Sequence, residues 1–141
     1  MSGRWDRDAG RVSAFLAIAI LAIFMIVALS YDGTRRLMAL QRAHNLAAEA
    51  ARTGGQAIDL GAAIDGGPKR LDEEAAIAAV NAYRAAAGVD GPPPVIEGEP
   101  PDQTITVTVE FDYQPILLRA FGQGAVPITG TATARPLTDE P

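Results

Sequence analysis

An apolar run from Val12 to Leu29 constrains this chain more than any other feature of its sequence. The run reads VSAFLAIAILAIFMIVAL and contains one polar residue, Ser13. As an α-helix it rises about 27 Å, close to the roughly 30 Å hydrocarbon thickness of a bilayer. The sequence therefore predicts a membrane-spanning helix over residues 12–30.

The spanning helix is predicted to continue beyond the membrane. Residues 30–58 contain no proline and are rich in Ala, Leu, Arg and Gln. An unbroken helix over residues 12–58 would be on the order of 70 Å long. Leu37, Leu40, His44 and then Ala47 or Ala48 recur at three- and four-residue steps, which predicts a helix with a narrow apolar stripe of small residues.

Alanines extend this stripe and predict close helix packing. Small side chains let a neighbouring backbone approach and gain dispersion contacts, so we expect this part of the helix to pack against its own sheet or a partner subunit. The natural cover within the chain is the strand face that carries Val107, Val109 and Phe111. The alanines expected at the contact are Ala47, Ala48, Ala50 and Ala51.

The chain is predicted to comprise a cytoplasmic leader (1–11), a transmembrane helix (12–30) and an extracytoplasmic domain (31–141). Three arginines precede the apolar run and two follow it, so the positive-inside rule favours a cytoplasmic N-terminus. The run is also compatible with a secretory signal cleaved after Ser30, but the apolar region of such signals is typically about 7 to 15 residues. A retained single-pass anchor in the cell membrane is therefore the favoured interpretation.

Charge and length exclude several classes of function. The part after Leu29 carries 9 basic and 15 acidic side chains, so nucleic acid is not an expected partner. The 141 residues leave room for one small domain beside the anchor and none for a large catalytic fold. Cysteine is absent, which excludes disulfides, thiolate metal sites and a cysteine nucleophile.

The domain is predicted to be α+β. Asp72 is a suitable N-cap for a second helix over 73–87, and Gly88 is a suitable C-cap. In residues 104–113, TITVTVEFDY, apolar side chains alternate with Thr, Glu and Asp, as in a half-buried strand. We expect a small, mainly antiparallel sheet with strands at 95–96, 104–113 and 126–134.

The apolar segment from Ile116 to Phe121 follows the longest predicted strand. Two interpretations stay open for it. It forms a short helix that caps the sheet, or it contacts the surface of the bilayer, as an exposed apolar patch would.

No catalytic, cofactor or metal site is expected. His44 is the single histidine, and no nucleophile and acid are positioned with it. Asp59, Asp65 and Asp72 do not follow the calcium-loop pattern, and the glycine-rich residues 66–69 lack the order of a phosphate-binding loop. No small-molecule substrate is evident either.

Charged and aromatic residues mark the outer end of the span. Tyr31 fits an interfacial aromatic residue. Asp32 is expected either to be solvated at the level of the lipid headgroups or to pair with an arginine of a neighbouring subunit. The candidates for the membrane exit and for subunit contacts are Tyr31, Asp32, Arg35, Arg36, Ala47 and Ala51.

The layout of the whole chain resembles a known family. A short Arg/Asp leader precedes the span, the motif YDGTRRLMALQRAHNLAAEAARTGGQAI follows it, a second alanine-rich helix ends in YRAAAG, and ITVTV and ITGTATA are threonine-alternating strands. Together they resemble the TadE/TadG-like proteins of Flp (tight adherence) pilus assembly in their actinobacterial form, most specifically over residues 6–58. The resemblance implies a type IV pilin-like fold and a role as a minor pilin or pseudopilin.

The resemblance also implies a processing site. Prepilin peptidases cleave after a glycine, and Gly10, followed by Arg11, stands at the edge of the apolar run. Family members usually carry Glu at the fifth mature position, where this chain has Phe15. We therefore expect cleavage after Gly10 to be inefficient or absent, which favours a TadG-like, permanently anchored role.

The resemblance implies a structural function rather than an enzymatic one. We expect an accessory subunit of a Flp-type pilus assembly or secretion system. Its expected partners are the lipid bilayer and other pilus or secretion subunits, a second copy of this chain included. The alternative is a membrane-anchored extracytoplasmic binding module unrelated to pili.

The apolar run predicts that the protein stays in the membrane fraction through a carbonate wash. Leu21→Arg places a charge near the middle of the run, which we expect to cost about 2.5 to 3.5 kcal/mol of insertion free energy. Immunoblots of washed membranes from cells that express either form measure the effect. Full-length wild-type protein in the soluble fraction would contradict the anchor.

Overall fold

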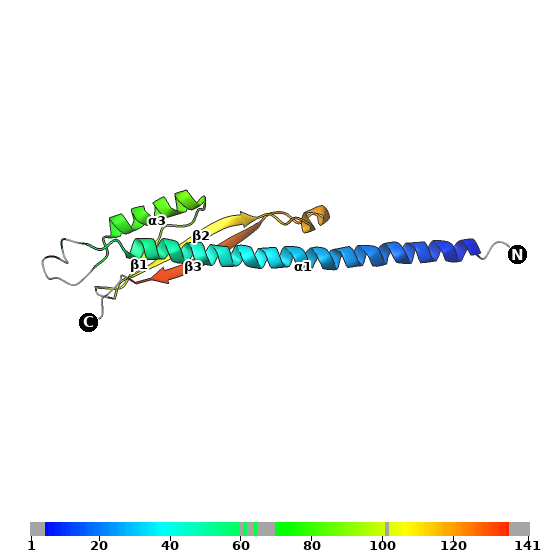
Figure 1. Cartoon of the computed structure of the whole chain (residues 1–141), viewed down its shortest axis with the longest axis horizontal. Helices are drawn as coiled ribbons and strands as arrows, with labels where there is room; N and C mark the ends of the chain where they lie inside the picture. The colour runs from blue at the N-terminus through cyan, green and yellow to red at the C-terminus, as the bar shows by residue number, and fades with distance from the viewer. Residues whose placement is uncertain (1–4, 60, 62–63, 65–69, 101, 136–141) are drawn as a thin grey trace. The chain divides into compact units, whose positions relative to one another are not determined.

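The computed structural model describes an α+β fold (Figure 1). The part of the chain that it describes comprises residues 5–59, 61, 64, 70–100 and 102–135. The first residues of the predicted leader, Asp65 and the glycine-rich residues 66–69 lie outside this part. The chain divides into two compact units, and each is described by itself.

The N-terminal unit comprises residues 1–36 and 114–125, and the sheet unit comprises residues 37–113 and 126–141. Helix α1 (Trp5–Gly55) contributes to both. It begins before Val12 and ends before Ile58, so both predicted bounds were wrong. The adjacent glycines at its end explain the earlier stop, because glycine is a poor helix former.

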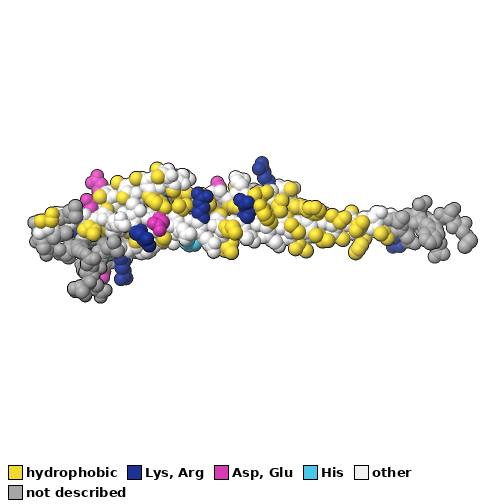
Figure 2. Space-filling view, in the orientation of Figure 1, with side chains coloured by type: hydrophobic (Ala, Val, Ile, Leu, Met, Phe, Trp, Pro, Cys, Tyr) yellow, Lys and Arg dark blue, Asp and Glu magenta, His cyan; other side chains and the backbone are white. Residues whose placement is uncertain are grey.

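The most apolar part of α1 is exposed. Among the described residues, α1 is the one helix long and apolar enough to cross a membrane, and 6% of its most apolar window is buried inside the protein. Figure 2 shows hydrophobic side chains along this part of the helix. A core helix of a globular domain would bury such a surface. The prediction of an apolar helix of spanning length is therefore confirmed.

Helix α3 (Glu73–Ala87) has the predicted bounds and caps. The Asp72 side chain accepts a hydrogen bond from the Ala75 N–H at 3.0 Å. Gly88 adopts a left-handed φ of 66°, a conformation that glycine reaches without a steric cost. The side chains that α3 buries are Ala76, Val80 and Arg84.

The described strands form an antiparallel sheet in the order β1-β2-β3. Strand β2 (Thr104–Tyr113) lies between β1 (Val95–Glu97) and β3 (Val126–Ala134). The predicted strands and their alternation are confirmed, since one face of β2 is fully buried at Ile105, Val107 and Val109.

Threonines line the opposite face of the sheet and pair across the strands. The hydroxyl oxygens of Thr106 and Thr133 lie 2.8 Å apart, and those of Thr108 and Thr131 lie 3.1 Å apart. Cross-strand pairs of this kind stabilise a sheet and fix its register.

Within the sheet unit, α1 packs on the buried face of the sheet. Ala50 and Ala51 share a cluster with Val107, and Ala47 shares one with Val109. The prediction that these alanines pack against the chain's own sheet is confirmed. Ala48 is exposed and does not belong to the contact.

The predicted stripe is confirmed at Ala47 and was wrong at Leu37, Leu40 and His44, which are exposed. The buried alanines of this part of α1 are Ala43, Ala47, Ala50 and Ala51. A row of alanines lets the sheet approach the helix backbone more closely than leucines would. Closeness of approach, rather than side-chain hydrophobicity, therefore decides which face is buried.

Glycines permit the closest contacts of α1. A Cβ atom on Gly130 of β3 would collide with the backbone of Ala43 and His44. A Cβ on Gly54 would lie 2.7 Å from Ile105 Cδ1 and 2.8 Å from a methyl group of Val80. Any side chain at these positions would therefore push α1 away from its neighbours.

Arg84 is a charged side chain buried by α3. Its guanidinium donates hydrogen bonds to the carbonyl oxygens of Thr108 and Gly91. Burial lowers the pKa of Arg84, while the negative charges of Asp90 and Glu110 oppose this effect. Through these bonds Arg84 joins α3 to β2 and to the turn that precedes β1.

We expect Gly130→Ala to lower the free energy of unfolding by about 1 to 3 kcal/mol through overpacking. The collision involves backbone atoms, so no rotamer change relieves it. Thermal unfolding of the detergent-solubilised chain, followed by circular dichroism, measures the change. Gly33→Ala is the matched control, because its Cβ would meet nothing within 4 Å. Equal stability of the Gly130→Ala variant and the wild type would contradict this packing.

Candidate functional site

The structure brings Asp32 of α1 together with the segment that follows β2. Its Oδ1 accepts a hydrogen bond from the Ile116 N–H at 2.9 Å, and its Oδ2 accepts bonds from the Leu117 and Leu118 N–H groups at 2.9 and 2.6 Å. The Asp32 residue is 2% exposed. We call this arrangement the Asp32 clamp.

The Asp32 carboxylate accepts hydrogen bonds from backbone N–H groups that the η1 segment itself provides no acceptor for. The 3-10 helix η1 (Leu118–Phe121) begins after Leu117 and has no side-chain cap at that residue. The first N–H groups of a helix lack an intrahelical acceptor. A carboxylate accepts several such bonds strongly, and a negative charge suits the positive end of a helix. Asp32 therefore caps η1 from a distant part of the sequence.

The clamp corrects one expectation. Asp32 is not a solvated carboxylate, because backbone N–H groups take the place of water around it. The expected short helix at Ile116–Phe121 is present as η1 (Leu118–Phe121), and within its unit the preceding N–H groups bond to α1. Its two interpretations, as a cap of the sheet and as a contact with the bilayer surface, stay predictions. Pairing of Asp32 with an arginine of a neighbouring subunit stays a prediction.

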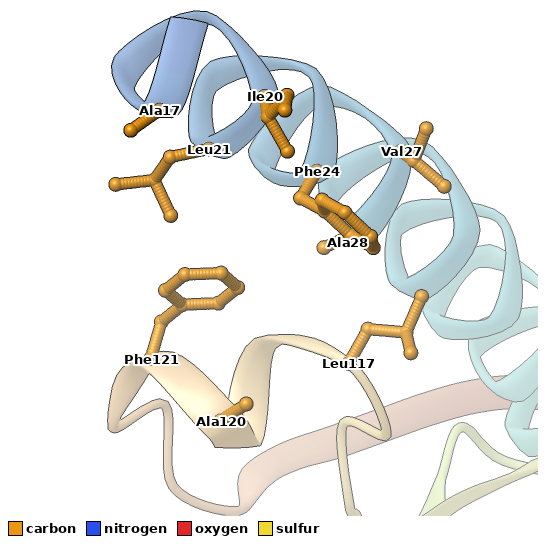
Figure 3. A pocket seen from close by; sticks show the side chains of 9 residues that line it. All are labelled: Ala17, Ile20, Leu21, Phe24, Val27, Ala28, Leu117, Ala120 and Phe121. Carbon is orange, nitrogen blue, oxygen red and sulfur yellow. The ribbon is translucent and has the colours of Figure 1, made fainter. Parts of the chain in front are cut away.

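An apolar cavity of about 600 Å³ lies between η1 and α1 in the N-terminal unit. Figure 3 shows Leu117 and Phe121 pointing from the η1 segment toward the helix. None of the lining residues has a polar side chain. They are Ala17, Ile20, Leu21, Phe24, Val27, Ala28, Leu117, Ala120 and Phe121.

Apolar side chains of the η1 segment are also open to the surroundings. Ile116 is 51% exposed and Phe121 is 47% exposed. In water, exposed apolar surface carries a cost of about 25 cal/mol per Å². Apolar groups concentrated around one cavity are typical of a surface that meets lipid or another protein.

Tyr31 and Arg35 form a pair one helical turn apart. Arg35 Nη1 donates a hydrogen bond to the Tyr31 hydroxyl at 3.1 Å, and Arg35 Cζ lies 5.7 Å from the centre of the Tyr31 ring. This geometry combines a hydrogen bond with a cation–π contact. It holds the Tyr31 ring and the Arg35 charge together just beyond the apolar stretch.

The other predicted site residues take no part in the hydrogen bonds of the clamp. Gly10, Arg11 and Arg36 are exposed on α1. Ala47 and Ala51 belong to the core of the sheet unit. The predicted residues therefore do not form a single site.

The Asp32 clamp holds two elements together by hydrogen bonds. Among the described residues, no group of three His, Cys, Asp or Glu side chains is placed to hold a metal ion. The clamp fixes a short apolar helix against an apolar stretch of α1. Its chemistry is hydrogen bonding and exclusion of water.

Sequence reasoning missed the amides of Ile116, Leu117 and Leu118 as the partners of Asp32. Both segments that form the clamp carried a signal in the sequence. Asp32 comes three residues after the end of an apolar run, and the apolar segment after Pro115 offers no Ser, Thr, Asp or Asn to cap its own helix. An acidic side chain from one part of the chain can cap a helix elsewhere that has no capping residue of its own.

Comparison of this chain with models of protein families, with curated proteins and with solved structures finds no match.

We expect Asp32→Ala to release η1, because three backbone N–H groups lose their acceptor. Each unsatisfied buried N–H costs about 1 to 3 kcal/mol, so amide exchange of residues 116–118 should accelerate at least about tenfold. Hydrogen–deuterium exchange of the detergent-solubilised chain measures this. Asp112→Ala removes an exposed acid of β2 and serves as the control. Unchanged exchange in Asp32→Ala would show that the clamp does not hold η1.

Proposed function

We propose that this protein is a membrane-anchored accessory subunit, of the minor pilin or pseudopilin kind, in a Flp/Tad-type pilus assembly or secretion system. In this proposal the N-terminus is cytoplasmic and residues 31–141 form a pilin-like extracytoplasmic domain. The proposal combines the sequence resemblance with the physical properties of α1.

The observation that carries the proposal is that two parts of α1 have different surroundings. Its apolar stretch is exposed, whereas its later part buries Ala47 and Ala51 against the sheet. One continuous helix thus supplies both a surface for lipid and a packing face for a domain. A subunit that must be held in a membrane while its domain contacts other subunits requires both properties.

A second observation favours contact with other subunits. Leu37, Met38 and Leu40 are 57%, 61% and 38% exposed on the part of α1 that belongs to the sheet unit. All three are far more exposed than the alanines of α1 that the sheet covers. Apolar side chains left uncovered by the chain itself are typical of protein–protein contacts.

The proposal is tested by placing a charge on this apolar surface in the native organism. We expect Met38→Glu to reduce the number of surface fibres about tenfold, the equivalent of roughly 1.4 kcal/mol of subunit affinity. Electron microscopy counts the fibres, and circular dichroism of the purified variant verifies its fold. Thr129→Lys, which also introduces one charge and lies opposite Glu110 on the exposed face of β3, is the control.

Photo-crosslinking identifies the partners directly. A benzophenone amino acid at position 38 should capture pilus or secretion subunits, and the same probe at position 129 should capture fewer. If deletion of the gene leaves fibres and secretion unchanged, and position 38 captures no such subunit, the chain is a binding module unrelated to pili.

A further inference from the structure

We propose that the cavity between η1 and α1 holds an acyl chain of an anionic phospholipid, whose headgroup is bound by Arg36 and Arg119. The inference rests on the membrane anchoring that the proposed function includes. It adds a specific lipid site to that anchor.

The position of the cavity favours an acyl chain. Its wall on α1 extends from Ala17 to Ala28, entirely within the apolar run. In a bilayer this part of the helix is surrounded by hydrocarbon. Water would need polar partners to fill the cavity, and the lining residues supply no polar side chain. An empty cavity would forfeit dispersion contacts along its whole wall.

The Asp32 clamp disfavours a transmembrane helix as the occupant. A transmembrane helix is about 10 Å wide with its side chains, whereas the Asp32 hydrogen bonds tie η1 directly to α1 at the cavity. A narrower, flexible acyl chain fits this space without separating η1 from α1.

Charge favours an anionic headgroup. Within residues 10–36 and 114–125, Asp32 is the one acidic residue, and its carboxylate is bound by backbone N–H groups. Arg36 lies about one turn beyond Asp32, and Arg119 follows Leu118, whose N–H is bonded to Asp32. Both arginines are exposed. Guanidinium groups bind phosphate oxygens well, so each of the two elements that form the cavity carries an exposed group that can bind a phosphate.

Fluorescence quenching by brominated lipids tests whether lipid contacts the cavity. Trp5 is the single tryptophan, so a Trp5→Phe chain carrying Phe121→Trp reports on one position. The vesicles consist of phosphatidylcholine with a minor fraction of a brominated lipid. We expect brominated phosphatidylglycerol to quench the fluorescence of the position 121 probe more strongly than the same fraction of brominated phosphatidylcholine. Ile77→Trp on α3 in the same background is the control, with no such difference. Equal quenching of the position 121 probe by the two brominated lipids would overturn the proposal.

Native mass spectrometry tests occupancy with phosphatidylglycerol as the probe. We expect wild-type chain to retain bound phosphatidylglycerol and Ala120→Leu, which fills the cavity, to lose it about tenfold more readily. Ala22→Leu makes the same change on α1 away from the lining residues and should behave as wild type. Arg36→Gln combined with Arg119→Gln should abolish the preference over phosphatidylcholine.

The outcomes separate this inference from the anchor. A chain that enters vesicles but retains no phosphatidylglycerol, or forms a lipid-free dimer that Ala120→Leu disrupts, overturns the lipid site and leaves the anchor intact. A chain that does not enter vesicles overturns both.

Discussion

The contact between α1 and β3 is the constraint on which the sheet unit depends. Gly130 lies so close to the backbone of Ala43 and His44 that a Cβ atom has no space. A three-stranded sheet without a covering layer is marginally stable at best, and α1 provides that layer with alanines rather than with large side chains. The apolar bulk of the interface comes from β2, whose Val107 and Val109 are fully buried. Small residues on the helix and β-branched residues on the strand thus fit one another.

The N-terminal unit depends on a different force. Its helix exposes nearly all of its apolar surface, so packing alone does not determine where η1 lies. The Asp32 carboxylate does, through three charge-assisted hydrogen bonds. A buried carboxylate is costly unless its acceptors are used, and η1 supplies the donors. The hydrogen bonds therefore offset the desolvation cost of both the Asp32 carboxylate and the backbone N–H groups.

The proposed lipid site and the proposed subunit contact use different parts of the chain. The lipid site requires the Asp32 clamp and the apolar lining around Phe121, whereas the subunit contact requires the exposed Leu37, Met38 and Leu40. In an assembly of such subunits, the two surfaces would meet lipid and protein respectively. The small core of the sheet unit needs neither surface for its own packing.

Local patterns in the sequence determined the elements of this fold. The apolar run predicted the exposed helix, the alternation in residues 104–113 predicted β2, and Asp72 and Gly88 predicted the ends of α3, because periodicity and capping act between near neighbours in the chain. Tertiary structure alone decided which face of α1 is buried and where Asp32 binds. The partners of Asp32 lie 84 to 86 residues away, and no local periodicity encodes such a distance. The alanine face is buried because it lets α1 approach Gly130 closely. That approach depends on the shapes of both the helix and the strand, and the pattern of hydrophobic residues along the helix does not specify those shapes.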